Sequence, residues 1–311
     1  MRWPVVARAL VSGSLAFTAL SGCCRLGVAT RPFTPAELEV ERASLQDDAG
    51  PSFQSAVVAP FVILAQSDTR DRATLDDAAQ TVTWARDRLR ASFFDHEPGK
   101  IVSIWVFPDE ESYMRGASAT LGTIPTTPYG FYRPCKRQLV VNAGLGWGTM
   151  VHELVHAFMA ADFPDAPVWM QEGLASLFEA PRDAAPSGDA GAALPSIRGE
   201  VNWRLPALQE AIARGGRAAP SFEEMFGGGR GDFDGKRGAL LYATSRYLLY
   251  YLQERGQLVR FYRAFRDAVA CGRDPRGQET LAQVTTEIAR GDLVALRHDF
   301  EGYVASLRFS R

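Results

Sequence analysis

The sequence has 311 residues, of which 46% are hydrophobic and 23% are charged, and its formal net charge is -2. This is the balance of an ordinary globular protein with enough length for a sizeable core. The nearly neutral charge argues against a polyanion-binding protein, so we expect no nucleic acid partner. Only four histidines occur in the chain, so a pair of them at short spacing carries information.

The first 22 residues are typical of an export signal. Arg2 and Arg8 supply positive charge, and the apolar stretch from Ala9 to Leu20 is too short to span a bilayer. The stretch ends in the sequence LSGC, which resembles the bacterial lipobox, in which the cysteine is lipidated. We therefore predict a lipid anchor at Cys23 that holds a soluble domain to a membrane of the bacterial cell envelope. A plain cleaved signal is the alternative.

The pattern along the chain predicts a signal peptide at 1–22, a tether at 23–52 with a short helix, and one domain at 53–311. Strands are expected mainly in part 53–146 and helices in part 147–311. The expected elements are a strand at 57–66, a helix at 75–94, a strand at 101–107, a short helix after Pro108, and strands at 130–132 and 138–141. A surface loop is expected at 181–199, and the glycine-rich run 227–231 is interpreted as a flexible linker. The fold class is therefore α+β, with a small N-terminal α/β sheet subdomain followed by a mainly helical C-terminal subdomain.

The segment from His152 to His156 reads HELVH, an HExxH pattern. On a helix, a spacing of four residues brings both imidazoles to one face, about one turn apart, where they can bind one metal ion. Glu153 lies beside them, close enough to take a proton from a water molecule at that metal. The flanking residues are apolar nearly all round, which predicts a buried helix. Buried imidazoles without a partner would be costly, so the pattern favours a metal site.

Two histidines leave a catalytic zinc site one protein ligand short. The downstream segment WMQEGLA places Glu172 on the face of a helix opposite its apolar side. Small residues nearby, Gly173 among them, predict that this helix approaches the HExxH helix closely enough for Glu172 to reach the metal. Glutamates are more often solvated surface residues. Glu179 is the nearest rival ligand.

HELVHAF followed by WMQEGLA resembles the gluzincin zinc metalloproteases, and among them the peptidase MA-like bacterial lipoproteins. The resemblance implies a zincin-like fold with the active site between the two parts. It implies one Zn²⁺ ion held by His152, His156 and Glu172, with Glu153 as the general base of peptide-bond hydrolysis. Fifteen residues separate His156 from Glu172, fewer than in thermolysin. The substrate class that follows is a protein or peptide.

The resemblance also suggests two groups that would contact a substrate. Segment 138–142, before the HExxH helix, matches the family's strand that pairs with the substrate backbone, with an ordinary sheet edge as the alternative. A long helix expected after residue 235 matches the one that supplies a donor to the substrate carbonyl. Tyr242 is the candidate for that donor. Because Tyr247, Tyr250 and Tyr251 lie on the same helix, a packing role is the alternative for Tyr242.

Two further interpretations of the whole chain stay open. Since an exported protein can oxidise its thiols, Cys135 and Cys271 are a possible disulfide, with Cys24 beside the anchor. The function has two alternatives to a peptidase, namely a catalytically inactive metal-binding envelope lipoprotein and a zinc hydrolase of a non-peptide envelope substrate. The intact Glu153 argues against the inactive alternative, because this residue contributes little to metal binding.

Overall fold

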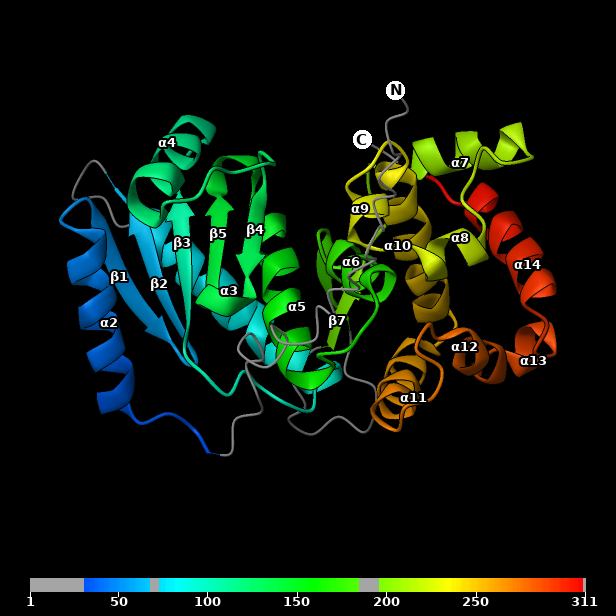
Figure 1. Ribbon diagram of the computed structural model, residues 1–311, viewed down its shortest axis with the longest axis horizontal. Coiled ribbons are helices and arrows are strands. Elements are labelled where there is room, and N and C mark those ends of the chain that lie inside the picture. The colour runs from blue at the N-terminus through cyan, green and yellow to red at the C-terminus, as the bar shows by residue number, and fades with distance from the viewer. Residues whose placement is uncertain (1–30, 68–72, 185–195, 310–311) are drawn as a thin grey trace, which may run out of the picture.

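The computed structural model describes residues 31–67, 73–184 and 196–309. The predicted signal peptide and the predicted lipidation site Cys23 lie outside the described residues. A sheet in the first half of the chain lies beside a group of helices in the second half (Figure 1). Of the described residues, no helix combines the length and the apolar character needed to cross a membrane.

Five strands form a mixed sheet in the order β1-β2-β3-β5-β4. The inner strands β2, β3 and β5 are parallel, and the edge strands β1 and β4 pair antiparallel with their neighbours. All residues of the central strand β3 are buried, as expected for a strand covered on both faces. The strands are β1 Phe53–Val58, β2 Phe61–Gln66, β3 Val102–Phe107, β4 Gly130–Arg133 and β5 Gln138–Asn142.

Alternating side chains of the inner strands face two different layers of helices. On one face, Ile63 and Ile104 pack in the core that includes α3 (Ala73–Ser92) and α5 (Gly148–Asp162). On the other face, Leu64 and Trp105 pack with α2 (Pro35–Ala49) and α4 (Glu110–Leu121). The sheet therefore forms the middle of three layers, and its α5 side is continuous with the helical half.

The helical half shares one hydrophobic core with the α3 and α5 face of the sheet. Helix α6 (Val168–Leu177) lies between the sheet and α10, and the remaining helices surround α10 (Figure 1). The bounds of these helices are α7 Leu205–Arg214, α8 Phe222–Gly227, α9 Arg230–Phe233, α10 Gly238–Glu254, α11 Leu258–Ala270, α12 Gln278–Val284, α13 Thr286–Ala289 and α14 Leu293–Ser306. The predicted order of elements, a sheet followed by helices, is confirmed, and the structure is of mixed α and β class.

Two predicted elements near the N-terminus differ from the structure. The single strand expected at 57–66 is a hairpin, because the chain reverses at Ala59-Pro60, where proline cannot donate to a strand ladder. The short helix predicted in the tether segment is confirmed as α2, but this helix is part of the folded domain: it begins with a capping box of Thr34 and Glu37 and buries Leu38 against the sheet. The folded domain therefore begins before residue 53.

The loop predicted at 181–199 contains a second, two-stranded sheet of β6 (Pro181–Ala184) and β7 (Ser196–Gly199). Contacts with distant parts of the chain hold this sheet in place. The indole N–H of Trp84 on α3 donates a hydrogen bond to Asp183 at 3.1 Å. The side chain of Gln253 on α10 makes hydrogen bonds of 2.8 and 2.9 Å to the backbone N–H and carbonyl of Gly199. The local composition gives no sign of these partners, so the prediction of a plain loop was wrong.

The predicted disulfide between Cys135 and Cys271 is also wrong. Cys135 is disulfide-bonded, whereas Cys271 is a free and exposed thiol. Cys135 lies in the turn η1 (Pro134–Lys136) between β4 and β5, and Cys271 ends helix α11 in the other half of the molecule. The export context that suggested the pair carries no information on the distance between these two segments in the fold.

Candidate metal site and cleft

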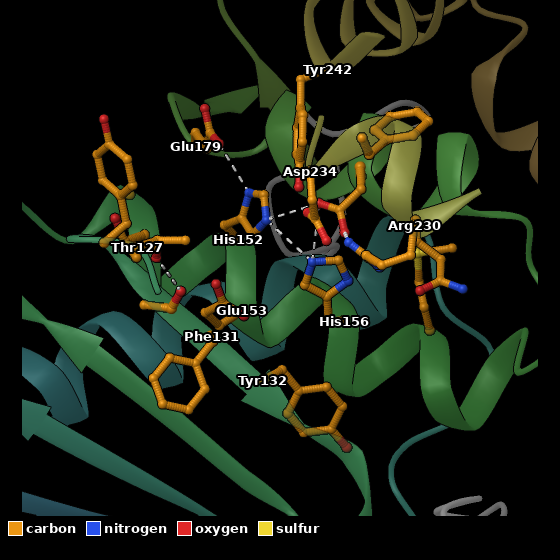
Figure 2. A pocket seen from close by; sticks show the side chains of 18 of the residues that line it. Thr127, Phe131, Tyr132, His152, Glu153, His156, Glu179, Arg230, Asp234 and Tyr242 are labelled. Carbon is orange, nitrogen blue, oxygen red and sulfur yellow. Dashed lines mark hydrogen bonds and ion pairs between the residues drawn. The ribbon is translucent and has the colours of Figure 1, made fainter. Parts of the chain in front are cut away.

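The two histidines of the HExxH pattern lie on α5 and face the same cleft. Their spacing of four residues brings His152 Nε2 and His156 Nε2 within 3.2 Å of one another. Both side chains are mostly buried. Their Nε2 atoms face one another at the floor of the cleft (Figure 2). The prediction that one helix presents both imidazoles to one point is confirmed.

Both ends of α5 are held by contacts with distant segments. At its start, a Cβ added to Gly148 would lie 2.1 Å from the carbonyl oxygen of Glu179, so only glycine permits this approach. At its end, the buried carboxylate of Asp162 accepts hydrogen bonds from Tyr262 and Arg266, both at 2.8 Å. The helix that carries the histidines is therefore fixed against both the Glu179 segment and α11.

Glu172 on α6 completes the group. Its Oε2 lies 3.5 Å from His152 Nε2 and 3.6 Å from His156 Nε2, and its side chain is almost fully buried. The sequence predicted that the small Gly173 would let α6 approach the HExxH helix closely, but this glycine faces α10. A Cβ added to Gly173 would lie 3.0 Å from the Cβ of Ser245. The small residue therefore allows α6 to pack closely on α10, while Glu172 on another side of α6 faces the histidines.

The three donor atoms fit a tetrahedral metal ion. With bonds of about 2.0–2.1 Å, two ligands of a tetrahedral zinc ion are about 3.3 Å apart. The three separations in the protein, 3.2, 3.5 and 3.6 Å, lie close to that value. These are also the residues of the described chain whose ligand atoms lie near enough to hold one ion. His152, His156 and Glu172 could therefore hold a metal and leave one position open toward the cleft.

Glu153 is buried and lines the same cleft as the histidines. Burial raises the pKa of its carboxyl above the usual value, although the neighbouring His152 and His156 act in the opposite direction. A carboxylate with a raised pKa is a stronger base than a solvated one. The position and environment of Glu153 suit proton transfer at the floor of the cleft.

Glu179, the rival ligand, approaches His152 from the opposite side of the ring. Its Oε1 lies 3.0 Å from His152 Nδ1, the nitrogen that does not face His156. Arg204 holds the same carboxylate through two hydrogen bonds, of 2.9 and 3.2 Å. A carboxylate on the second nitrogen of a ligating histidine fixes the orientation and the tautomer of the ring. Glu179 is therefore placed to orient His152, and only Glu172 faces both histidines.

The charges around His152 reinforce this arrangement. Burial disfavours the protonated ring, but the carboxylates of Glu172 and Glu179 outweigh it and raise the pKa of His152 to about 10. Burial also disfavours the charged Glu179, yet His152 and Arg204 hold the pKa of that carboxyl down at about 2. A metal ion that binds His152 must displace a proton from it.

Arg230 is a site residue that sequence analysis missed. It lies in the glycine-rich run that was interpreted as a linker, and it begins the short helix α9. Its Nη1 donates a hydrogen bond to Glu172 Oε1, and the other carboxylate oxygen, Oε2, faces the two histidines. Arg230 itself is seen beside His156 in Figure 2. Burial lowers the pKa of Arg230, but Glu172 more than compensates and raises it. The sign of this role in the sequence was a single charged residue within a run of glycines, downstream of both helices that carry the candidate ligands.

Tyr242 on α10 lines the cleft, and its hydroxyl points toward the histidines (Figure 2). Burial and the charge of Glu172 raise the pKa of the phenol, so it stays protonated and able to donate a hydrogen bond. The other tyrosines of α10 make contacts outside the cleft. Tyr247 donates to the Asn202 carbonyl, Tyr251 donates to Asp299, and Tyr250 stacks on Tyr303.

The cleft has a volume of about 1240 Å³ and is bounded on the sheet side by β4. The sequence predicted segment 138–142 as the exposed edge, but this strand is β5, which lies between β3 and β4. The exposed edge is β4, because β4 pairs antiparallel with β5 and covers the side of β5 that faces away from β3. Strand β4 and helix α5 lie side by side, since a Cβ added to Gly130 would lie 3.0 Å from Thr149 Cγ2 at the start of α5.

We expect replacement of Glu172 by alanine to weaken metal binding most, because it removes a candidate ligand. Replacement of Glu179 by glutamine should weaken it by about 10–100-fold, because the orientation of His152 is lost. Glu210→Gln, in an exposed ion pair with Arg214, is the matched control and should bind like wild type. Competition with a chelator of known zinc affinity measures all three. Wild-type affinity of Glu179→Gln would show that Glu179 does not orient His152.

Comparisons with known proteins give no relative. No model of a known protein family matches the chain, and a search of curated proteins finds no similar sequence.

Proposed function

We propose that the protein is a zinc-dependent peptidase of the gluzincin type with a zincin-like fold. One observation carries the proposal: three donor atoms, on His152, His156 and Glu172, lie 3.2–3.6 Å apart beside the buried Glu153 in one cleft. Two imidazoles and one carboxylate with an open position are a known ligand set of catalytic zinc sites. A structural zinc site would have four protein ligands and no cleft above it.

The residues of the cleft divide the chemistry of amide hydrolysis among them. Zinc, when bound, supplies a Lewis acid for the substrate carbonyl and for water. Glu153 takes the proton of the attacking water and returns it to the nitrogen of the leaving amine. Tyr242 donates a hydrogen bond to the carbonyl oxygen as negative charge develops there. Glu179 and Arg204 keep His152 in the orientation that faces the metal.

The free edge of β4 supports a peptide as the substrate. The backbone amide of Asn142 donates to the Tyr129 carbonyl at 2.9 Å, so Tyr129 and Asn142 form a hydrogen-bonded pair. Along two antiparallel strands, hydrogen-bonded and non-hydrogen-bonded pairs alternate. The alternation turns the backbone groups of Gly130 and Tyr132 outward. The hydroxyl of Thr127 donates to the Gly130 carbonyl. The backbone N–H of Gly130 and the backbone N–H and carbonyl of Tyr132 then face outward, where an added strand could bind them. An extended peptide can bind to such an edge through its backbone.

Metal analysis of the purified protein, combined with hydrolysis of an unfolded protein such as casein, tests the proposal. We expect about one zinc ion per chain and hydrolysis that stops when a chelator removes the metal and returns with zinc. Stoichiometric zinc without any hydrolysis of proteins or peptides would contradict a peptidase. Release of products from cell-wall fragments in the same experiment would then favour a zinc hydrolase of a non-peptide substrate.

We also propose that the protein is an exported lipoprotein anchored at Cys23. The disulfide at Cys135 supports an oxidising compartment, since disulfides persist outside the reducing cytosol. Replacement of Cys23 by serine should release the protein from membranes or leave an unprocessed precursor, because a lipid chain is the membrane attachment that the sequence offers. Detergent partitioning of both forms measures this. A Cys23→Ser protein that partitions like wild type would contradict the anchor.

A further inference from the structure

Cys135 is half of a disulfide whose partner the other cysteines identify. The chain has four cysteines, namely Cys23, Cys24, Cys135 and Cys271. Cys135 is disulfide-bonded, and Cys271 is a free thiol at the end of α11. Cys23 and Cys24 precede residue 31 and lie outside the described residues. By elimination, one of these two adjacent cysteines is bonded to Cys135.

The predicted lipid at Cys23 decides between the two. A cysteine sulfur forms two bonds, and one goes to its own Cβ, so a sulfur that carries a lipid has none left for a disulfide. Cys24, the next residue, carries no predicted modification. We propose that Cys24 is bonded to Cys135 and that this disulfide holds the turn between β4 and β5 against the membrane surface. The inference rests on the proposed anchor at Cys23 and does not depend on the proposed peptidase activity.

The fold brings the start of α2 to the same end of the sheet as this turn. Helix α2 packs on β1, leads into it after three residues and therefore runs opposite to it. Strand β1 is antiparallel to β2, which is parallel to β3, and β3 is parallel to β5. Helix α2 thus begins at the end where β5 begins, which is where η1 joins β4 to β5 (Figure 1). One contact marks this proximity, because Arg137 Nη2, directly after η1, lies 3.9 Å from Glu41 Oε1 on α2.

The segment between Cys24 and α2 is long enough to close the disulfide. Cys24 precedes Thr34, the N-cap of α2, by ten positions. An extended chain of ten residues spans at most about 33–36 Å. Glu41 lies about 10 Å from Thr34 along the helix, since each residue of an α-helix adds about 1.5 Å. The turn that contacts Glu41 is therefore within reach of Cys24.

The chain around Cys135 is positively charged. It reads RPCKR, and we call residues 133–137 the basic turn. Cys135 and Lys136 are exposed. Lys100 is also exposed and lies beside the basic turn, because Arg137 Nη1 donates to the carbonyl of the residue after Lys100 at 3.2 Å. The carboxylate that contacts Arg137 offsets one of these charges, so the surface stays positive. Basic residues close to a lipid anchor are attracted to anionic headgroups and strengthen membrane attachment.

The disulfide shortens the connection between the lipid and the folded domain. Consecutive Cα atoms lie about 3.8 Å apart, and those of a disulfide at most about 7 Å, so Cys135 lies within about 11 Å of the anchored Cys23. Without the bond, the lipid is connected to Thr34 through eleven positions, which extend to about 36–40 Å. With the bond, the basic turn faces the bilayer. Since Pro134 lines the cleft, that end of the cleft lies beside the membrane.

Mass spectrometry of the full-length protein tests the pairing. The protein is purified from membranes, its free thiols are alkylated, and it is digested with trypsin without reduction. We expect a lipid-bearing peptide with Cys24 that is linked to the peptide of Cys135 and separates from it on reduction, together with an alkylated Cys271. A link from Cys135 to Cys23 would overturn both the inference and the anchor. An alkylated Cys135 in a protein with the lipid at Cys23 would overturn the inference alone.

Fluorescence from a dye on the free thiol of Cys271 tests the orientation. The labelled protein is reconstituted into vesicles of phosphatidylcholine and anionic phosphatidylglycerol, and energy transfer to a headgroup dye reports the distance of Cys271 from the bilayer. We expect a narrow distribution of transfer efficiency in wild type. In Cys24→Ser/Cys135→Ser it should be at least about twofold wider, because a flexible tether lets the domain rotate. An unchanged circular dichroism spectrum checks that this variant folds. Equal widths would overturn the orientation.

Lys136→Gln separates the charge of the basic turn from the disulfide. It should widen the distribution on anionic vesicles and leave it unchanged on vesicles of phosphatidylcholine alone. Lys236→Gln, at an exposed lysine just before α10 and outside the cleft lining, is the matched control and should behave like wild type. A Lys136→Gln protein that behaves like this control on anionic vesicles would overturn the contact between the basic turn and the membrane.

Discussion

Glu153→Gln is expected to lower kcat for peptide hydrolysis by about a hundredfold to ten-thousandfold, the usual contribution of a general base. Glutamine has nearly the same shape as glutamate, but its amide cannot take a proton from water. Glu153 lies beside the candidate ligands and is not one of the three, so zinc content should stay at the wild-type level. Initial rates on a defined peptide, with zinc measured in the same preparation, check both statements.

Glu210→Gln, the exposed variant used as the metal-binding control, is also the control for this substitution. It should leave both rate and zinc content unchanged, because Glu210 lies on α7 in a surface ion pair. A zinc-loaded Glu153→Gln protein with the wild-type rate would remove Glu153 from the chemistry. Loss of zinc from Glu153→Gln would instead show that the carboxylate helps to hold the metal.

Tyr242→Phe is expected to lower kcat by about a hundredfold to a thousandfold, as is usual when one donor to a developing oxyanion is removed. The phenol faces the histidines from α10 and stays protonated. It stabilises the transition state more than the bound substrate, so KM should change much less than kcat. Steady-state kinetics of the zinc-loaded variant measure this difference.

The proximity of Tyr242 to Glu172 allows a different role, which the same variant distinguishes. A hydroxyl that only orients the Glu172 carboxylate would change zinc affinity and leave kcat of the saturated enzyme near the wild-type value. Tyr250→Phe is the matched control, because this tyrosine stacks on Tyr303 away from the cleft. Equal and small effects on kcat at both positions would assign Tyr242 to packing.

The site is built as a chain of contacts that extends well beyond the candidate ligands. Glu179 links His152 to Arg204, and the Arg204 guanidinium lies 5.3 Å from the centre of the Tyr242 ring and 5.5 Å from that of Trp203. One arginine thus contacts Glu179, which orients a ligand, the proposed oxyanion donor Tyr242, and Trp203. Lysine could supply the charge of Arg204 but not its two parallel hydrogen bonds to one carboxylate.

The sequence by itself determined the parts of the site that depend on local geometry. The HExxH spacing places His152 and His156 on one helical face whatever surrounds the helix, because the α-helix repeats every 3.6 residues. The strand expected at 101–107 and the short helix expected after Pro108 were also predicted from local sequence, and they correspond to β3 and α4. Glu172 was proposed as a ligand from its motif, and the structure brings it to the histidines.

Only the tertiary structure decided which distant groups complete the site. Arg230 reaches Glu172 across 58 positions of sequence, and Arg204 reaches Glu179 across 25. No periodicity or local motif encodes such contacts, because they depend on how α6, α9 and the segment after β7 pack together. The edge strand and the cysteine pair were mispredicted for the same reason. Whether β4 or β5 is exposed, and whether Cys135 lies near Cys271, depends on how segments separated in the chain come together in space.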